Sequence, residues 1–374
     1  MAGEIQPIVM PKWGLAMEEG VVTAWHVAEG ATISKGQEIA DIETSKIANV
    51  FESPTSGTLR KLVAQPGETL PVGALLAVVA DKSVGDGDIE AFVAKFNEAL
   101  KEALAARASE KKPEPETMEV AGGSRIRHLK LGSGEGAPIV FVHGFGGDLN
   151  NWLFNQEALA EQHTAYALDL PGHGGSSKEI GSGDLASMTA ALAAWMAALG
   201  IARAHLVGHS MGGAVSLQLA ATAPDKVVSV TGICPAGLGP DIAMDYINGF
   251  IEASRGKKLE PVLQMLVADP ALVTRDMIED VLKFKRIDGV DAALRRMRDA
   301  MFPGGRQAVL LRDSLGKLSQ PVQVIVGAKD RIIPPSHAQG LPGSVKVHVL
   351  ENAGHMPHME AASEVNRLIA AITA

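Results

Sequence analysis

The feature that most constrains this chain is an internal repeat near its start. Shifting the sequence by 37 positions places residues 20–42 on residues 57–79 without a gap, and three glycine pairs then coincide: Gly20 with Gly57, Gly30 with Gly67, and Gly36 with Gly73. Apolar residues recur in both stretches at short, strand-like spacings, so each stretch predicts the same β-half with turns at its glycines. Two such halves can bury their apolar faces only against each other. We therefore expect a small all-β sandwich over residues 1–80.

The connection between the two halves, ETSKIANV, contains Lys46. A lysine considered alone is usually a solvated surface residue, but this one lies between two repeated halves, where a hairpin turn would expose its amine. PKWGLAMEEG, the glycine-spaced halves and ETSK at the junction together resemble a lipoyl domain. The resemblance implies that lipoic acid is covalently attached to Lys46 and carries an acyl group as a thioester.

A biotin domain or an unmodified domain is the alternative interpretation. Biotin acceptors usually have a methionine on each side of the lysine, whereas Ser45 and Ile47 flank Lys46. The familiar lipoyl pattern has Asp before the lysine and Ala after it, so this sequence departs from that pattern at both flanking positions.

Residues 81–121 are richer in charge and predict a linker with one amphipathic helix. Asp88 is a plausible helix cap, and apolar residues recur at intervals of three and four positions: Ile89, Phe92, Val93, Phe96, Leu100 and Leu104. This apolar face could pack on the following domain or dock to another subunit. EKKPEPETME then predicts an extended, solvated segment. The longer partner-binding module that classical lipoate acyltransferases carry at this point is not recognisable here.

From Ile126 onward, strand-like runs alternate with helical segments, which predicts a largely parallel sheet covered on both faces. The strand candidates are residues 138–144, 164–170, 204–209, 226–233, 321–328 and 345–350. Between Leu238 and Arg306 lies a mostly helical insertion.

The sharpest motif is GHSMG at residues 208–212, after a strand and before a helix-like segment. Small residues on both sides of Ser210 suit an abrupt strand-to-helix turn that presents a nucleophile. A serine needs a base to take its proton and a carboxylate to orient that base. His355 and Asp330 each follow a strand and come in the expected chain order. His358 is the rival base, but the position directly after a glycine turn favours His355.

Acyl transfer also needs hydrogen-bond donors for the developing oxyanion. The HGFGG turn at residues 143–147 can direct the N–H of Phe145 toward the same point as the N–H of Met211. Three further histidines are interpreted as structural turn residues, because none has zinc-like spacing with a partner: His143, His173 and His209. No metal site is expected.

With these motifs in order, residues 122–374 resemble the α/β-hydrolase family, in which an insertion such as residues 238–306 forms a cap over the active site. The fold class expected is thus multidomain, a lipoyl sandwich followed by an α/β-hydrolase domain. That fusion resembles the acetyltransferase components of acetoin dehydrogenase systems. The likeness implies that a thiamine-diphosphate-dependent acetoin dehydrogenase component acetylates lipoyl-Lys46, that this chain passes the acetyl group to coenzyme A, and that dihydrolipoamide dehydrogenase restores the disulfide.

Two other functions stay open on sequence grounds. Water could replace coenzyme A as acceptor, which would make the protein a thioesterase or ester hydrolase. The hydrolase half could instead be a docking module in a non-catalytic lipoyl carrier. A homo-oligomer is expected.

The composition limits which classes of binding partner and which cellular compartment are expected for this chain. Lys and Arg total 34 against 43 Asp and Glu, a net charge of −9, which gives a nucleic-acid partner no support. The richest apolar stretch, residues 190–202, is too short to span a bilayer, so no membrane association is expected. The single cysteine, Cys234, cannot form an intrachain disulfide, and the first twenty residues show no secretory signal. A cytoplasmic location is therefore expected.

Overall fold

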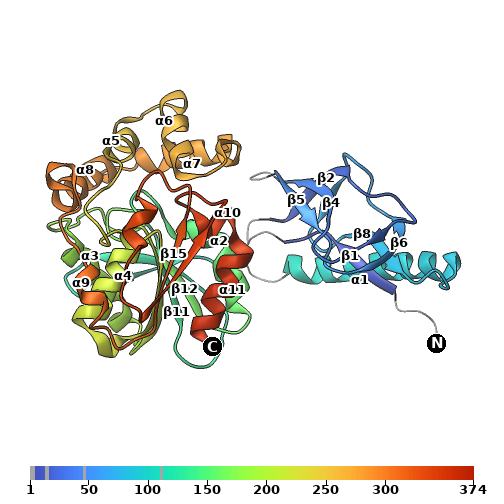
Figure 1. The fold of residues 1–374 in the computed structure, drawn as a ribbon, viewed down its shortest axis with the longest axis horizontal. Helices are drawn as coiled ribbons and strands as arrows, with labels where there is room; N and C mark the ends of the chain where they lie inside the picture. Colours follow the sequence, from blue (N-terminus) through green and yellow to red (C-terminus); the bar gives the residue numbers. More distant parts are fainter. Residues whose placement is uncertain (1–4, 13–16, 45–47, 110–112) are drawn as a thin grey trace. The chain divides into compact units, whose positions relative to one another are not determined.

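The chain divides into two compact units, Met1–Lys112 and Pro113–Ala374 (Figure 1). The computed structural model describes residues 5–12, 17–44, 48–109 and 113–374. The first unit is a small β-domain with one helix, and the second is a larger α/β domain. This architecture confirms the expected fold class. Among the described residues, no helix has both the length and the apolar character that crossing a bilayer requires.

Within its described residues, the β-domain has two four-stranded antiparallel sheets. One has the order β1-β8-β6-β3, formed by Ile5–Val9, Leu75–Ala80, Gly57–Leu62 and Thr32–Ile33. The other has the order β5-β4-β2-β7, formed by Ala48–Glu52, Glu38–Glu43, Glu19–Trp25 and Thr69–Pro71. The two repeated halves exchange their short strands, because β3 pairs with β6 and β7 pairs with β2. The halves therefore interlock around their shared core.

The repeated glycines adopt matching backbone conformations. Gly30 and Gly67 both have φ +86°, and Gly36 and Gly73 have φ +81° and +84°. L-residues rarely adopt this region, so these turns recur in both halves because glycine occupies the same position in each.

Helix α1 (Asp86–Ser109) packs on the β-domain that precedes it, which neither sequence-based alternative anticipated. Its Ile89, Phe92 and Phe96 lie in one apolar cluster with residues of β8, and Arg60 forms a 2.7 Å ion pair with Asp86. The reason lies in β8, whose sequence LLAVVA is buried at every position. A strand without polar alternation needs cover on both faces, and α1 supplies the second cover.

The α/β domain contains an eight-stranded sheet with the order β16-β15-β14-β13-β11-β12-β10-β9. In chain order the strands are β9 (Glu116–Glu119), β10 (Arg125–Leu131), β11 (Ile139–Val142), β12 (Ala165–Leu168), β13 (Ala204–His209), β14 (Val227–Ile233), β15 (Val322–Gly327) and β16 (Val345–Leu350). The strands from β12 to β16 along this order are parallel, whereas β10 pairs antiparallel with both β9 and β12. The parallel strands occur where sequence analysis expected them, and β9 and β10 add an unexpected antiparallel edge.

Helices cover both faces of this sheet. Helices α3 (Leu185–Ala198) and α4 (Met211–Thr222) pack together over the face that holds Val140 and Val142. Phe141, which lies between these valines and points to the opposite face, contacts Trp152 next to α2 (Leu153–Ala160). On this opposite face, α2 packs with the C-terminal helix α11 (Ala362–Thr373).

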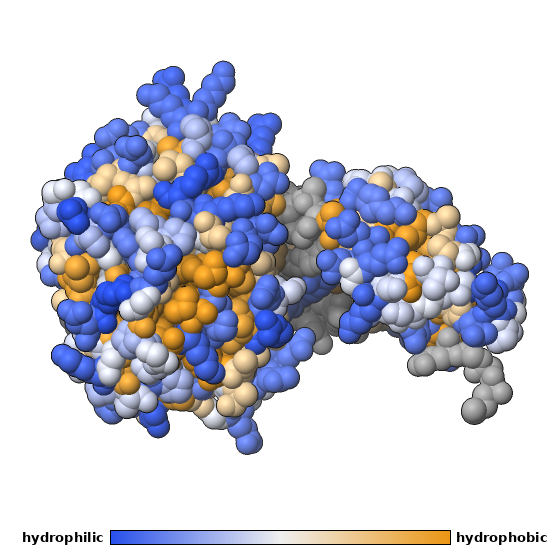
Figure 2. Space-filling view, viewed as in Figure 1, coloured by the Kyte–Doolittle hydropathy of each residue, from blue (hydrophilic) through white to orange (hydrophobic). Residues whose placement is uncertain are grey.

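Four of the helices between β14 and β15 form a separate layer beside the sheet (Figure 1). They are α5 (Met244–Glu252), α6 (Gly256–Leu263), α7 (Arg275–Lys285) and α8 (Val290–Met301). Each buries one apolar side, while hydrophilic residues cover the outer surface of this layer (Figure 2). We call this layer the cap.

Candidate active site

Ser210 occupies a sharp turn between the end of β13 and the start of α4. Its backbone has φ +51° and ψ −115°, a conformation that costs a non-glycine residue about 1–3 kcal/mol. Hydrogen bonds fix this turn from both sides, because the Ser210 N–H donates to the oxygen of Ile233 (2.9 Å) and the Ser210 oxygen accepts from the N–H of Ala236 (3.0 Å). The end of β14 and the residues that follow it therefore keep Ser210 in this strained conformation.

The glycines of the motif are required by close backbone approaches. A Cβ at Gly208 would lie 2.2 Å from the oxygen of Gly212, and a Cβ at Gly212 would lie 2.1 Å from the oxygen of Val142. No other residue fits either position without moving the backbone. The G-x-S-x-G spacing thus reflects the steric demands of the turn that presents Ser210.

Asp330 and His355 form a buried hydrogen-bonded pair. His355 Nδ1 donates to Asp330 Oδ2 at 2.7 Å, and both side chains are 2% exposed. The other oxygen of Asp330 accepts from the N–H groups of Ile332 (2.7 Å) and Ile333 (3.0 Å). Burial alone would raise the pKa of Asp330, but the charge and hydrogen bond of His355 and these N–H donors lower it. With Nδ1 donating to a carboxylate, Nε2 of neutral His355 is the proton acceptor.

His209 connects the serine turn to the histidine loop. Its Nε2 donates to the backbone oxygen of His355 at 2.8 Å, and the rings of His209 and His355 are 4.8 Å apart. Because Ser210 follows His209 directly, this contact brings the serine segment and His355 together. The role is structural, in line with the sequence-based interpretation of His209.

The geometry does not favour His358 as the base. Its ring is fully buried between Trp152 (4.7 Å) and His209 (4.6 Å), and neither ring nitrogen has a hydrogen-bond partner within the described part of the chain. Burial lowers the pKa of His358 to about 3. A ring enclosed by other rings cannot take a proton from a bound substrate.

The HGFGG turn is held in place by two buried histidines. His143 Nε2 accepts from the N–H of Leu170 (2.9 Å), and His173 Nε2 accepts from the N–H of Gly146 (3.0 Å). Burial lowers the pKa of both imidazoles, which keeps them neutral and able to accept. His143 and His173 are therefore structural residues of this turn.

The backbone N–H groups proposed for the oxyanion are not engaged elsewhere. The N–H of Phe145 has no acceptor among the described residues, and Met211 is the first residue of α4, where an N–H has no partner within the helix. A Cβ on Gly144 would lie 3.0 Å from the Cβ of Ser210, so this turn passes directly beside the serine. Phe250 of the cap packs against Phe145, with ring centroids 6.1 Å apart.

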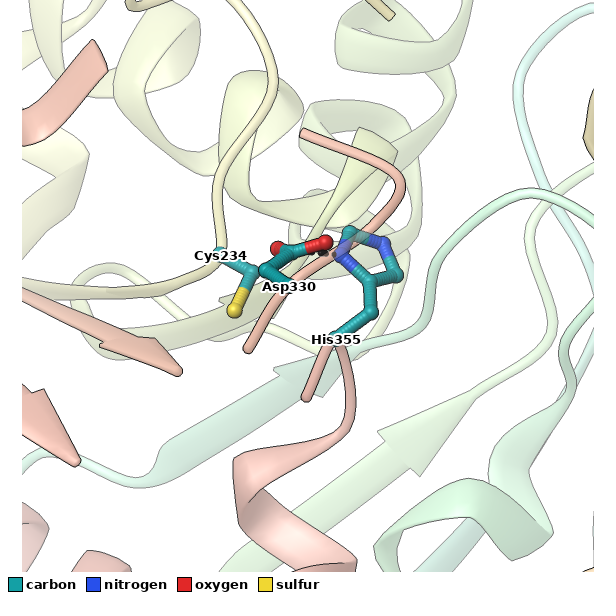
Figure 3. A group of neighbouring side chains, drawn as sticks. All are labelled: Cys234, Asp330 and His355. Atoms are coloured by element: carbon teal, nitrogen blue, oxygen red, sulfur yellow. Dashed lines mark hydrogen bonds and ion pairs between the residues drawn. The ribbon is translucent and has the colours of Figure 1, made fainter. Parts of the chain in front are cut away.

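Cys234 lies beside Asp330 of the Asp330–His355 pair (Figure 3). Its sulfur, a carboxylate oxygen of Asp330 and a ring nitrogen of His355 all lie within 4.8 Å of one another. Burial and the negative charge of Asp330 raise the pKa of the thiol, which donates to the oxygen of Gly354 at 3.8 Å. A protonated thiol beside a carboxylate already bonded to the imidazole fits a hydrogen-bonded cluster better than a metal site.

Lys46 lies outside the described residues. The strands on either side of it, β4 and β5, are paired antiparallel with Glu43 opposite Ala48. In the sequence, Lys46 belongs to the connection between these two strands.

Two family models match the chain in the order of its domains. Residues 6–79 match the family of biotin-requiring enzymes with biotin or lipoyl attachment, and residues 137–362 match the α/β hydrolase fold. The chain is also 51% identical over 365 residues to the dihydrolipoyllysine-residue acetyltransferase component of the acetoin cleaving system of Pseudomonas putida, with 97% of each chain covered. This chain belongs to that family.

A second member of the family, the protein of the same name from Cupriavidus necator, is 44% identical over 373 residues and covers 99% of this chain and 98% of its own. Among solved structures, a meta-cleavage product hydrolase from Pseudomonas fluorescens IP01 is 22% identical with a TM-score of 0.62, covering 69% of this chain and 97% of that one. This likeness concerns the fold. The resemblance inferred from the sequence is confirmed.

Sequence reasoning missed several residues that shape the site. Asp169 is fully buried, forms a 2.6 Å ion pair with Arg127 and accepts from the N–H of Leu149 (2.8 Å). The DLPGHGG segment that follows β12 was the available signal for Asp169. Cys234 had no comparable signal, because a lone cysteine indicates only a redox environment.

Proposed function

We propose that this chain is the acyltransferase of an acetoin-cleaving complex, which moves an acetyl group from lipoyl-Lys46 to coenzyme A through Ser210, His355 and Asp330. The observation that carries the proposal is the strained serine turn beside the buried His355–Asp330 pair, in a chain that also contains a lipoyl-type domain. Near-full-length identity to the acetyltransferase components of two acetoin cleaving systems supports the assignment.

Lys46 is the residue that would hold lipoic acid. The antiparallel strands on either side of it suit an exposed attachment point, and the family relatives are named for a dihydrolipoyllysine residue. When bound, lipoic acid would supply the acetyl group as a thioester of its reduced form.

In the first half of the reaction, Ser210 Oγ attacks the thioester carbonyl while His355 Nε2 takes the hydroxyl proton. Asp330 stabilises the imidazolium through its hydrogen bond to Nδ1. The N–H groups of Phe145 and Met211 donate to the oxyanion. His355 then gives its proton to the departing thiol, and the acetyl group remains on Ser210 as an ester.

In the second half, His355 takes the thiol proton of coenzyme A. The sulfur attacks the acetyl-serine carbonyl, and the same two N–H groups hold the oxyanion. When the tetrahedral intermediate collapses, His355 returns the proton to Ser210 Oγ, and acetyl-CoA leaves.

Product analysis tests whether coenzyme A or water accepts the acetyl group. Acetyl-dihydrolipoamide is supplied with coenzyme A, and acetyl-CoA and free acetate are measured separately. The proposal expects acetyl-CoA as the main product, formed with ping-pong kinetics. Acetate alone, at all concentrations of coenzyme A, would establish a thioesterase instead.

We further propose that the partners are a thiamine-diphosphate-dependent acetoin dehydrogenase component and dihydrolipoamide dehydrogenase, and that the chain is a homo-oligomer in the cytoplasm. The relatives' name as a component of an acetoin cleaving system supports a multienzyme assembly. Acetoin-dependent NADH formation with the three purified proteins, lost when any one is omitted, tests the partners. Sedimentation of the purified chain tests its oligomeric state.

A further inference from the structure

A short segment of the cap, residues 264–268, lies in direct backbone contact with the loop that carries His355. The His355 N–H donates to the oxygen of Leu266 at 2.8 Å. A Cβ on Gly354 would lie 2.7 Å from the nitrogen of Ala268, so only glycine allows this approach. The cap therefore touches the histidine loop through main-chain atoms, which side-chain substitutions in the cap cannot remove.

Glu360 joins the same two segments through its carboxylate. One oxygen accepts from the N–H groups of Gly354 (2.9 Å) and Met356 (3.1 Å), the residues on either side of His355. The other oxygen accepts from the N–H of Ala268 (2.7 Å), 92 positions away in the sequence. Three backbone donors thus converge on one partly buried side chain, and none of them has another acceptor among the described residues.

Arg331 holds the opposite side of the cap segment. It directly follows Asp330, and its Nη2 donates to the backbone oxygens of Val267 (2.9 Å) and Gln264. Residues 264–268 are consequently bound by an anionic side chain from the His355 loop and by a cationic side chain from the Asp330 loop.

We propose that Glu360 and Arg331 are positioning residues that align the His355–Asp330 pair by clamping both of its loops to residues 264–268 of the cap. The inference rests on the proposed function, because it requires His355 to act as the base. Glu360 reaches no reacting atom and acts through the backbone of Gly354 and Met356, the residues on either side of His355. A loop shift of about 1 Å in such a site can cost about 10²-fold in rate.

The test uses the full chain with p-nitrophenyl acetate, whose turnover requires acylation of Ser210 but neither lipoic acid nor coenzyme A. Glu360→Ala removes the acceptors for all three N–H donors, and we expect kcat to fall about 30- to 100-fold with KM changed less than about threefold. Glu360→Gln keeps one acceptor oxygen for the His355 loop, so it should recover most of kcat. The control is Glu364, an exposed residue of α11 with an ion pair to Arg367, for which Ala and Gln variants should stay within twofold of wild type.

A kcat of Glu360→Ala within twofold of wild type, or a loss confined to KM, would overturn the proposal. If Glu360→Ala fails to fold, as judged by circular dichroism, Arg331→Met decides the matter, and a kcat within twofold of wild type in this variant would overturn the proposal. A Ser210→Ala variant distinguishes the two levels of the argument. If Ser210→Ala retains wild-type turnover of the ester, the proposed function is wrong, and the positioning role of Glu360 and Arg331 is then wrong as well.

The shared attachment to the cap is tested by combining variants. Because Glu360 and Arg331 hold the same segment, the loss in the double variant Glu360→Ala with Arg331→Met should be smaller than the product of the two single losses. Strictly multiplicative losses would show that the two side chains act independently, which contradicts a common clamp.

Discussion

The β-domain and the α/β domain differ in where they place the residues proposed to react. In the β-domain, two interlocked halves bury one small core, and Lys46, which lies outside the described residues, follows β4 and precedes β5 in the chain. In the α/β domain, Ser210, His355 and Asp330 lie among buried residues at the ends of parallel strands, and the backbone at Ser210 is strained. A carrier residue needs reach, whereas a nucleophile needs a fixed environment. We therefore expect some substitutions to lower the reaction rate without changing stability, and others to lower stability.

The largest effect is expected for Ser210→Ala. Acetyl-CoA formation should fall by about 10⁴-fold or more, because the base and oxyanion donors remain but the attacking oxygen is gone. The melting temperature should change little, since alanine fits the space of serine. Acetyl transfer from acetyl-dihydrolipoamide measures the loss. Unchanged turnover of the reconstituted complex would instead support a non-catalytic carrier.

Lys46→Arg gives the complementary result. Acetoin-dependent turnover of the complex should be abolished, because arginine cannot form the amide to lipoic acid. Turnover of p-nitrophenyl acetate at Ser210 should be unchanged, because the α/β domain has its own core. Intact mass measures the modification in wild type and its loss in the variant. A mass increment that fits biotin would contradict the lipoyl assignment.

Asp330→Asn should reduce acetyl transfer by about 10³- to 10⁴-fold. The amide cannot accept from Nδ1 of His355 with the strength of a carboxylate, and it allows the tautomer in which Nε2 carries the proton. Single-turnover acylation of Ser210 measures the effect. A loss of less than tenfold would show that another group orients His355, with Cys234 the nearest candidate.

Two glycine substitutions compare the steric tolerance of the domains. Gly212→Ala places a Cβ 2.1 Å from a backbone oxygen, so we expect a loss of about 3 kcal/mol or more in the free energy of unfolding. Gly30→Ala has open space around its Cβ and only an unfavourable positive φ, which costs about 1 kcal/mol. Denaturant unfolding of both variants measures the difference, and equal losses would contradict the comparison.

The smallest effect concerns pH. Burial lowers the pKa of His205 to about 4, from a usual value near 6.5. The unfolded chain therefore binds a proton at His205 between pH 6.5 and 4 that the folded domain does not, and stability falls as the pH falls through this window. In the His205→Gln variant, the slope of the unfolding free energy against pH should become smaller, by an amount that corresponds to at most one bound proton. A pH dependence identical to wild type would show that other buried histidines determine it.

The sequence predicted those parts of the site that follow from local constraints. The serine turn was predictable because steric crowding forces glycines on both sides of Ser210, and Asp330 and His355 were found because each follows an apolar strand. The partner of α1 was not predictable, since an apolar helix face shows that it is covered but not by what. Glu360 and Asp169 were missed because each also accepts from a donor that is distant in the sequence, Ala268 for Glu360 and Leu149 for Asp169.

Strand β10 was missed for a different reason. Its sequence, RIRHLKL, interrupts the apolar residues with charged ones, yet His128 is buried against Trp195, with ring centroids 5.5 Å apart. A histidine that packs as an aromatic residue does not count as apolar in a pattern search.

The exchange of β3 and β7 between the repeated halves affects whether the β-domain stays assembled after proteolytic cleavage. The connection between the repeated stretches ends with residues 53–56, which lie between β5 and β6. A protease that cleaves there would leave two fragments that still share both sheets. The first would contribute β1 and β3 beside β8 and β6, and the second would contribute β7 beside β2. Such fragments should remain associated and should reassemble after dilution from denaturant, which makes this domain a natural candidate for a two-piece reporter.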